Sequence, residues 1–174
     1  METVSFMRRL FTLIGLAALQ VLFLNRIALF GYVTPLFYIW MIVRFESSMT
    51  RNSILLWSFF LGLSIDLSSG TPGLNAASAT LLGMFQPAIM KLFVALDRYD
   101  VVVPGKGSMG RAYTGYLLLA TVLHHTVYFI LRSIPLGDWS VLVAKILLSS
   151  LLTLMFMLVA EYSFVNSGSK RSTK

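Results

Sequence analysis

Charged positions divide this chain into long uncharged stretches, and this division predicts where helices cross a membrane. A helix needs roughly 17 to 25 mostly apolar residues to cross about 30 Å of hydrocarbon. Six stretches meet or approach that length, and they predict spans over about residues 10–25, 34–44, 52–66, 75–91, 111–132 and 139–162. The pattern predicts an all-α, polytopic integral membrane protein built as a six-transmembrane-helix bundle.

Individual residues refine the predicted boundaries. The first stretch lies between Arg9 and Arg26, and no small-residue cleavage site follows its apolar part, so we expect an uncleaved first span. Pro35 suits the first turn of a helix, so the second span is expected to begin near it and to be short or tilted. We expect one helical domain over residues 1–166 and a polar cytoplasmic tail over residues 167–174.

Basic residues gather on one side of the predicted bundle. Six spans place both termini on the same side, together with eleven of the 14 Lys and Arg residues. These eleven are Arg8, Arg9, Arg44, Arg51, Lys91, Arg98, Lys106, Arg111, Lys170, Arg171 and Lys174. Arg26 and Arg132 lie on the other side, and Lys145 lies within the sixth span. The positive-inside rule therefore predicts cytoplasmic termini.

Composition agrees with a membrane protein and removes several classes of function. Hydrophobic residues make up 57% of the chain and charged residues 12%, whereas soluble domains are about half apolar and a quarter charged. The pI of about 10.0 is explained by basic flanks that meet anionic lipid, so no nucleic-acid partner is expected. The chain has no cysteine, which excludes disulfides, thiol catalysis and Cys-based metal sites.

Catalysis is not expected from the remaining polar residues. The predicted spans hold no paired acids, no Ser-His-Asp arrangement with a spacing that can be argued, and no cluster of aspartates that could hold a metal ion. We therefore expect neither enzyme activity nor a cofactor.

The stretch between the third and fourth spans combines one carboxylate with glycines and small residues. Asp66 falls at the outer end of the third span, where an acid costs less than at the bilayer centre, and one interpretation is that it caps the turn or helix that follows. Gly70 and Gly73 flank a Thr-Pro pair and predict a tight turn. Ala76 begins a run of small residues that allows two helices to approach closely. We expect a closely packed hairpin.

The same stretch resembles the signature of a known family. Residues Gly62 to Ala76 follow the pattern G-L-x-x-D-L-x-S-G-x-x-G-x-x-A, which is similar to the rod shape-determining protein MreD family. The length, six-span layout and basic loops are also similar to that family. The resemblance implies a bacterial inner-membrane protein with a fold similar to the substrate-binding subunits of energy-coupling-factor transporters. It further implies as partners the bitopic protein MreC, the actin-like MreB, the glycosyltransferase RodA and a transpeptidase of lateral peptidoglycan synthesis.

Two functions are carried forward from the sequence. The first is a non-enzymatic scaffold of the cell-elongation machinery that binds the membrane span and juxtamembrane region of MreC and supports cell shape. Small residues such as Gly62 and a polar stripe on the fifth span would set the register of helix recognition. The alternative is a small-molecule (vitamin) binding subunit of an energy-coupling-factor-type transporter, with a closed pocket on its outer side.

The polar stripe follows one face of the fifth predicted span. Thr121, His124 or His125, Tyr128 and Arg132 recur at spacings of three or four residues. A ligand pocket or proton relay is one interpretation, and interhelical hydrogen bonding or contact with a partner helix is the other. Adjacent histidines point about 100° apart on a helix, which argues against one metal ion bound by both.

Two further expectations concern charged residues. Asp66, Arg132 and Lys145 are predicted at similar depths, so we expect an outer-side cluster in which Asp66 pairs with Arg132 or Lys145. The loop over residues 97–111 is expected in the cytoplasm, where residues 97–100 either contact a partner or end a helix.

Overall fold

The computed structural model describes residues 2–27, 33–94, 102–133 and 139–169, and every regular element in these ranges is helical. The α-helices are α1 (Glu2–Leu22), α2 (Trp40–Val43), α3 (Arg51–Ser69), α4 (Leu74–Lys91), α5 (Lys106–Met109), α6 (Ala112–Ser133) and α7 (Trp139–Ser169). Two short 3₁₀ helices, η1 (Leu24–Arg26) and η2 (Phe37–Ile39), flank the segment between α1 and α2. The predicted all-α class is confirmed.

Among the described residues, three helical segments are long and apolar enough to cross a bilayer, namely Phe6–Arg26, Ala112–Ser133 and Trp139–Ser163. They correspond to the first, fifth and sixth predicted spans. The first and last helices extend beyond the predicted spans, because α1 already begins at Glu2 and α7 continues to Ser169. Charged residues mark where hydrocarbon ends, but arginine is a good helix former and does not end a helix.

The third and fourth predicted spans are the helices α3 and α4, whose 19 and 18 residues match the expected ranges closely. They fall outside the three most apolar segments because α4 in particular carries polar side chains. Asn75, Ser78 and Gln86 of α4 are all at most 2% exposed, so these polar groups face the interior of the bundle. Phe60 and Met84 on the opposite faces are 52% and 44% exposed.

The second predicted span is helical only over residues 37–43, so its helix begins near Pro35 and is short, as expected, but does not fill the predicted range 34–44. Residues 34–36 are non-helical, η2 begins at Phe37, and α2 contains only 4 residues. Proline lacks an N–H group and restricts the residue before it to extended conformations, which disfavours a helix through this point. The segment is nevertheless central, because Tyr38, Ile39 and Ile42 are completely buried.

Side chains from α1 and α7 satisfy the irregular backbone of this segment. Ser149 Oγ accepts from the Thr34 N–H at 3.1 Å, and Thr153 Oγ1 accepts from the Leu36 N–H at 3.0 Å. Gln20 Nε2 donates to the carbonyl of Pro35 at 2.8 Å. Buried backbone outside regular helices needs such partners, because water cannot reach it.

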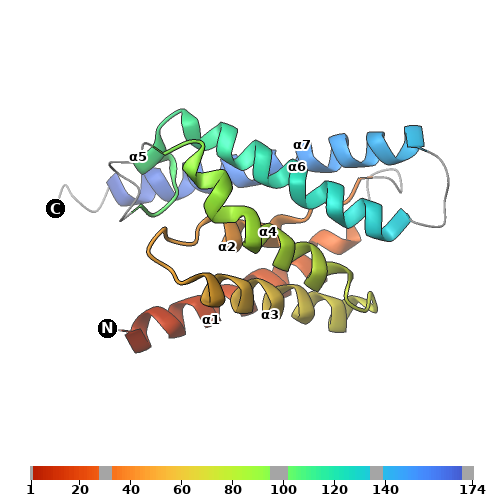
Figure 1. Cartoon of the computed structure of the whole chain (residues 1–174), viewed down its shortest axis with the longest axis horizontal. Helices are drawn as coiled ribbons and strands as arrows, with labels where there is room; N and C mark the ends of the chain where they lie inside the picture. Colours follow the sequence, from red (N-terminus) through yellow and green to blue (C-terminus); the bar gives the residue numbers. More distant parts are fainter. Residues whose placement is uncertain (1, 28–32, 95–101, 134–138, 170–174) are drawn as a thin grey trace.

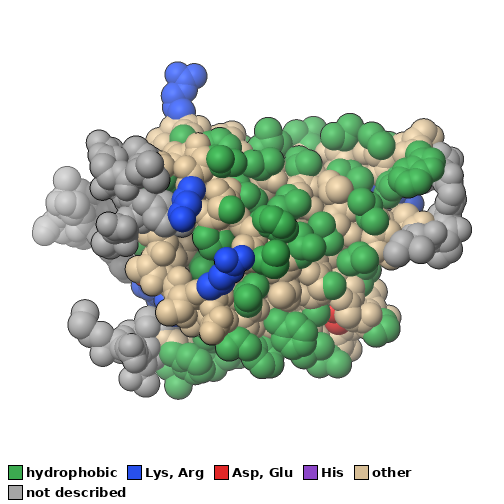
Figure 2. Space-filling model, viewed as in Figure 1, with side chains coloured by type: hydrophobic (Ala, Val, Ile, Leu, Met, Phe, Trp, Pro, Cys, Tyr) green, Lys and Arg blue, Asp and Glu red, His purple; other side chains and the backbone are tan. Residues whose placement is uncertain are grey.

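The helices run back and forth along the long axis of the molecule (Figure 1). Both chain ends lie at one end, and the turn between α3 and α4 lies at the other. The most extensive packing is between α3 and α4, and α6 packs against both α4 and α7. In Figure 2, hydrophobic side chains cover much of the visible face, and most visible Lys and Arg side chains lie toward the end that carries the termini. We call this the basic end.

Candidate functional site

The turn between α3 and α4 is organised around the Asp66 carboxylate, which is 3% exposed. Its Oδ1 accepts from Thr71 Oγ1 at 2.8 Å and from both the N–H and Nδ2 of Asn75 at 2.9 Å. Its Oδ2 accepts from the Ala76 N–H at 2.8 Å. Gly73 occupies the N-cap position of α4 and has no side chain that could cap the helix. Asp66, which belongs to α3, caps α4 in its place. The capping interpretation is confirmed.

Two glycines give the turn its shape. Gly70 ends α3 with a φ of 65°, and Gly73 precedes α4 with a φ of 80°. Both angles lie in the left-handed region, which glycine adopts at little cost because it has no Cβ. The Gly70 N–H also donates to the Asp66 carbonyl. The predicted tight turn is therefore confirmed.

Small residues bring α3 and α4 into backbone contact beneath the turn. A Cβ on Gly62 would lie 2.6 Å from Ala76 Cα, so glycine is required for this approach. Further along α4, a Cβ on Gly83 would overlap the side chain of Ser58 in α3. The Ser58 hydroxyl donates to the Ile54 carbonyl of its own helix. The small residues of the motif thus serve the α3–α4 contact itself, and Ala76 is only 4% exposed.

A buried hydrogen-bonded chain leads from the capped turn to the centre of α6. Asn75 Nδ2 donates to Asp66, so its Oδ1 is free to accept from the Tyr38 hydroxyl at 3.2 Å. The Tyr38 oxygen then accepts from His124 Nε2 at 2.9 Å. This order of donors assigns the hydrogen of neutral His124 to Nε2. Its Nδ1 is buried and has no partner among the residues that the structure describes.

His125 belongs to a different set of contacts. Its Nδ1 donates to the Thr121 carbonyl at 2.9 Å, and its Nε2 accepts from Thr153 Oγ1 at 3.1 Å. Because Thr153 in turn accepts from the Leu36 N–H, His125 helps to hold the irregular segment before α2. The two histidines thus serve interhelical hydrogen bonding, one toward Tyr38 and the other toward α7, as the second interpretation of the stripe predicted.

The C-terminal end of the stripe, in the last turn of α6, carries an arginine that does not reach Asp66. Arg132 donates to the Tyr128 hydroxyl at 2.8 Å, and the Tyr128 ring stacks on His124 with centroids 6.4 Å apart. Within the described residues, Asp66 bonds only to the turn and the start of α4. The predicted pairing of Asp66 with Arg132 or Lys145 is wrong, because donors of its own hairpin already surround the carboxylate.

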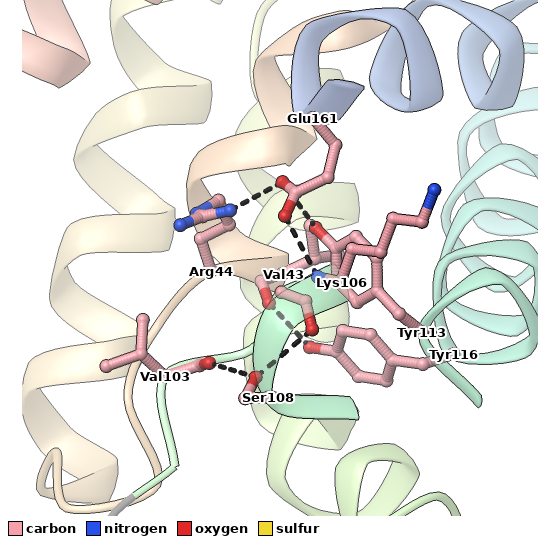
Figure 3. A network of polar contacts seen from close by, with 9 residues as sticks. Val43, Arg44, Val103, Lys106, Ser108, Tyr113, Tyr116 and Glu161 are labelled. Carbon is pink, nitrogen blue, oxygen red and sulfur yellow. Dashed lines mark hydrogen bonds and ion pairs between the residues drawn. The ribbon is translucent and has the colours of Figure 1, made fainter. Parts of the chain in front are cut away.

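A second polar cluster lies at the basic end around Glu161 of α7 (Figure 3). Arg44 Nη1 donates to Glu161 Oε2 at 2.6 Å, and the Lys106 N–H donates to Oε1 at 2.9 Å. Tyr113 also donates to Oε2, at 3.5 Å. Glu161 is only 4% exposed, so this acid joins α2, α5, α6 and α7 rather than marking the aqueous end of a span. Sequence reasoning missed this role.

Gln86 of α4 closes the same end of the core. Its Nε2 donates to the Phe45 carbonyl and to the Tyr116 hydroxyl, each at 3.1 Å. Tyr116 donates onward to the Val43 carbonyl at 2.8 Å. These bonds satisfy the carbonyl of the last residue of α2 and a carbonyl of the segment that follows it. A glutamine inside an uncharged run was the available signal for such a role.

The outer surface of the α3–α4 hairpin bears a shallow apolar groove of about 450 Å³. Its lining consists of small or apolar side chains: Phe59, Gly73, Ala76, Ala77, Thr80, Leu81 and Met84. We call it the hairpin groove. Gly62 and Asp66 do not line it, because both are buried beneath the hairpin. The expected partner contacts of residues 97–100 lie outside the described residues.

Comparison with known proteins identifies no relative: no protein-family model, curated protein or solved structure matches this chain.

Proposed function

We propose that this chain is a non-enzymatic scaffold of the MreD type that binds the membrane span of MreC in the bacterial inner membrane. The observation that carries the proposal is the hairpin from Gly62 to Ala76, the stretch that resembles the family signature. Five motif positions, Gly62, Asp66, Gly70, Gly73 and Ala76, have a structural task in it, and its outer surface bears a groove of small or apolar residues. Through MreC, the scaffold joins the elongation machinery with MreB, RodA and a transpeptidase, and supports lateral peptidoglycan synthesis.

The polar character of α3 and α4 is compatible with six membrane crossings. Asp66, Asn75 and Gln86 are buried and bonded within the protein. Large apolar side chains such as Phe60 and Met84 point outward. Residues 33–43 provide the remaining crossing, since four non-helical and seven helical residues can together reach about 25 Å at most. Protein surrounds this segment, which is the condition for irregular backbone in a bilayer.

Orientation follows from the basic end. The start of α1, the end of α7 and most of the visible Lys and Arg side chains lie there, which under the positive-inside rule supports a cytoplasmic location for this end. The hairpin turn and Asp66 then lie at the outer side of the membrane.

The hairpin groove suits a transmembrane helix. Association of helices in lipid depends on close van der Waals contact, and small residues permit it. Gly73, Ala77 and Thr80 line the groove and leave the α4 backbone approachable along its outward face. Gly62 and Asp66 support the groove from below and have no direct part in the contact.

Co-purification with MreC from the same bacterium, in mild detergent, tests the proposal. The unmodified chain is expected to retain MreC, and Ala77→Leu is expected to reduce retention about tenfold, because a leucine obstructs close helix contact. Ala144→Leu is the matched control, since Ala144 is exposed on α7, away from the groove. Circular dichroism melting establishes that both variants fold.

Failure of the unmodified chain to retain MreC would contradict the proposed partner, and equal retention by both variants would contradict the groove. The transporter alternative makes a separate prediction. A vitamin-binding subunit purified from cells should release a small molecule on denaturation, whereas a scaffold should release lipid only. Mass spectrometry of the denatured protein distinguishes the two.

A further inference from the structure

We propose that a groove between α1 and α2 at the basic end binds the phosphodiester headgroup of an anionic phospholipid. The groove encloses about 380 Å³, which falls within the range of small-molecule sites. Its lining combines arginines with apolar and aromatic side chains: Arg8, Arg9, Thr12, Trp40, Met41, Arg44, Phe45, Glu46, Met49 and Val103. We call it the basic groove. The site is separate from the hairpin groove and does not depend on the proposed scaffold function.

The charges in the basic groove favour a monoanion. Arg8, Arg9 and Arg44 oppose a single acid, Glu46, whose carboxylate accepts from the Ser48 hydroxyl at 3.4 Å. Arg44 uses Nη1 for Glu161, but a guanidinium has five N–H donors, so others remain for a ligand. Three arginines and Glu46 give the lining two net positive charges. If Glu161 neutralises Arg44, one net positive charge remains, which matches the single negative charge of a phosphodiester.

The aromatic residues are those expected where lipid headgroups meet protein. The Arg44 guanidinium lies over the Trp40 ring, 5.2 Å from its centroid. The Phe37 ring stacks with the same Trp40 ring, with centroids 6.0 Å apart. Tryptophan is enriched at the membrane interface because its ring is amphipathic. The arrangement holds the guanidinium of Arg44 in place at the rim of the core.

The surface next to the basic groove indicates a lipid rather than a soluble phosphate. One turn along α1 from the two arginines, Phe11 is 72% exposed and Ile14 is 54% exposed. Acyl chains of a lipid whose headgroup sits at Arg8 and Arg9 can lie on these side chains. Basic sites between helices at the cytoplasmic side are a known way for proteins to recognise anionic headgroups.

Native mass spectrometry after exchange into lipid-free detergent tests the site, with phosphatidylglycerol and phosphatidylcholine as probes. The unmodified chain is expected to retain phosphatidylglycerol in preference to phosphatidylcholine. Each Lys or Arg near an anionic lipid contributes about fivefold to binding, so Arg8→Gln with Arg9→Gln should weaken it by roughly 10- to 30-fold. The control is Arg51→Gln with Arg111→Gln, which removes the same charge from exposed positions outside the groove.

The outcomes separate the possible sources of binding. Loss of phosphatidylglycerol only in the Arg8 and Arg9 variant supports the proposal. Equal loss in both double variants would mean attraction to a diffuse basic surface and would overturn the site, as would unchanged binding in both. Displacement of the lipid by millimolar glycerol 3-phosphate would overturn the choice of a lipid, because it would show that the acyl chains add nothing. Melting curves of the variants confirm that each is folded.

Discussion

Replacement of Asp66 by leucine should destabilise the protein strongly, because the carboxylate accepts from four donors of its own hairpin. Two of these donors are the backbone N–H groups of Asn75 and Ala76, both buried. A buried donor without a partner costs about 1–3 kcal/mol, so the pair costs about 2–6 kcal/mol. The leucine variant no longer has to bury a charge, and this offsets part of the cost. The expected net loss in the free energy of unfolding is about 2–4 kcal/mol.

Less severe substitutions at the same turn should give a graded series. Asp66→Asn retains one acceptor but turns an NH₂ group toward N–H donors, with an expected cost of about 1–2 kcal/mol. Thr71→Val removes a single half-buried donor and should cost under about 1 kcal/mol. For a chain of this length, 1 kcal/mol shifts the melting temperature by about 2–4 °C, so Asp66→Leu should lower it by roughly 4–16 °C.

Circular dichroism melting in detergent measures this series. Asp66→Leu with an unchanged melting temperature would refute the capping role, as would a larger effect for Thr71→Val than for Asp66→Leu. A double-mutant cycle between Asp66 and Arg132 should give no coupling beyond about 0.5 kcal/mol. A coupling above that would mean that the two charges pair after all.

Three further substitutions test other contacts by the same melting assay. Gly62→Ala should destabilise the protein by about 1–3 kcal/mol, because the added Cβ overlaps the backbone of α4. Gly15→Ala is the control: its Cβ meets open space, so it should be neutral or stabilising by up to about 1 kcal/mol. Equal shifts in melting temperature for the two variants would contradict the close approach of α3 and α4. Thr153→Val should destabilise the protein by about 2 kcal/mol, because it leaves the Leu36 N–H and His125 Nε2 unpaired. Thr12→Val is the control and should change the stability little, because the Thr12 hydroxyl donates only within its own helix. Glu161→Gln should cost about 1–3 kcal/mol by weakening the contacts that join α2, α5 and α7, and an unchanged melting temperature would mean that these contacts contribute nothing.

The hairpin could be predicted from sequence because its interactions are local. The cap, the two left-handed glycines and the close contact all join residues within the stretch from Gly62 to Ala76. Residue type is informative at each of these positions, since only glycine tolerates the left-handed angles cheaply and aspartate is a preferred capping residue.

The interior contacts of the second predicted span could not be predicted in the same way. Thr34 and Leu36 are held by Ser149 and Thr153, which lie 115 and 117 positions away in the chain. Counting uncharged residues measures length and apolarity, and it says nothing about whether distant side chains will replace helical hydrogen bonds. The same method took Glu161 for the end of a span, although its partner Arg44 lies 117 positions away.

The polar stripe of α6 was predicted as a pattern but not in its partners. Spacing placed His124, Tyr128 and Arg132 on one face, and the structure brings these three side chains together. The same pattern could not indicate that Asn75 and Tyr38 connect His124 to Asp66, since those residues belong to other elements.

Cysteine accessibility in intact cells tests the membrane arrangement most directly, because the chain has no cysteine of its own. Arg51→Cys places an exposed thiol at the first residue of α3, and Pro72→Cys places one shortly after its last residue. A membrane-impermeant maleimide is expected to label the thiol at position 72 in intact cells, and the thiol at position 51 only after the inner membrane is opened. Labelling of both positions from outside, or of neither, would contradict a bundle in which α3 crosses the bilayer with its basic end in the cytoplasm.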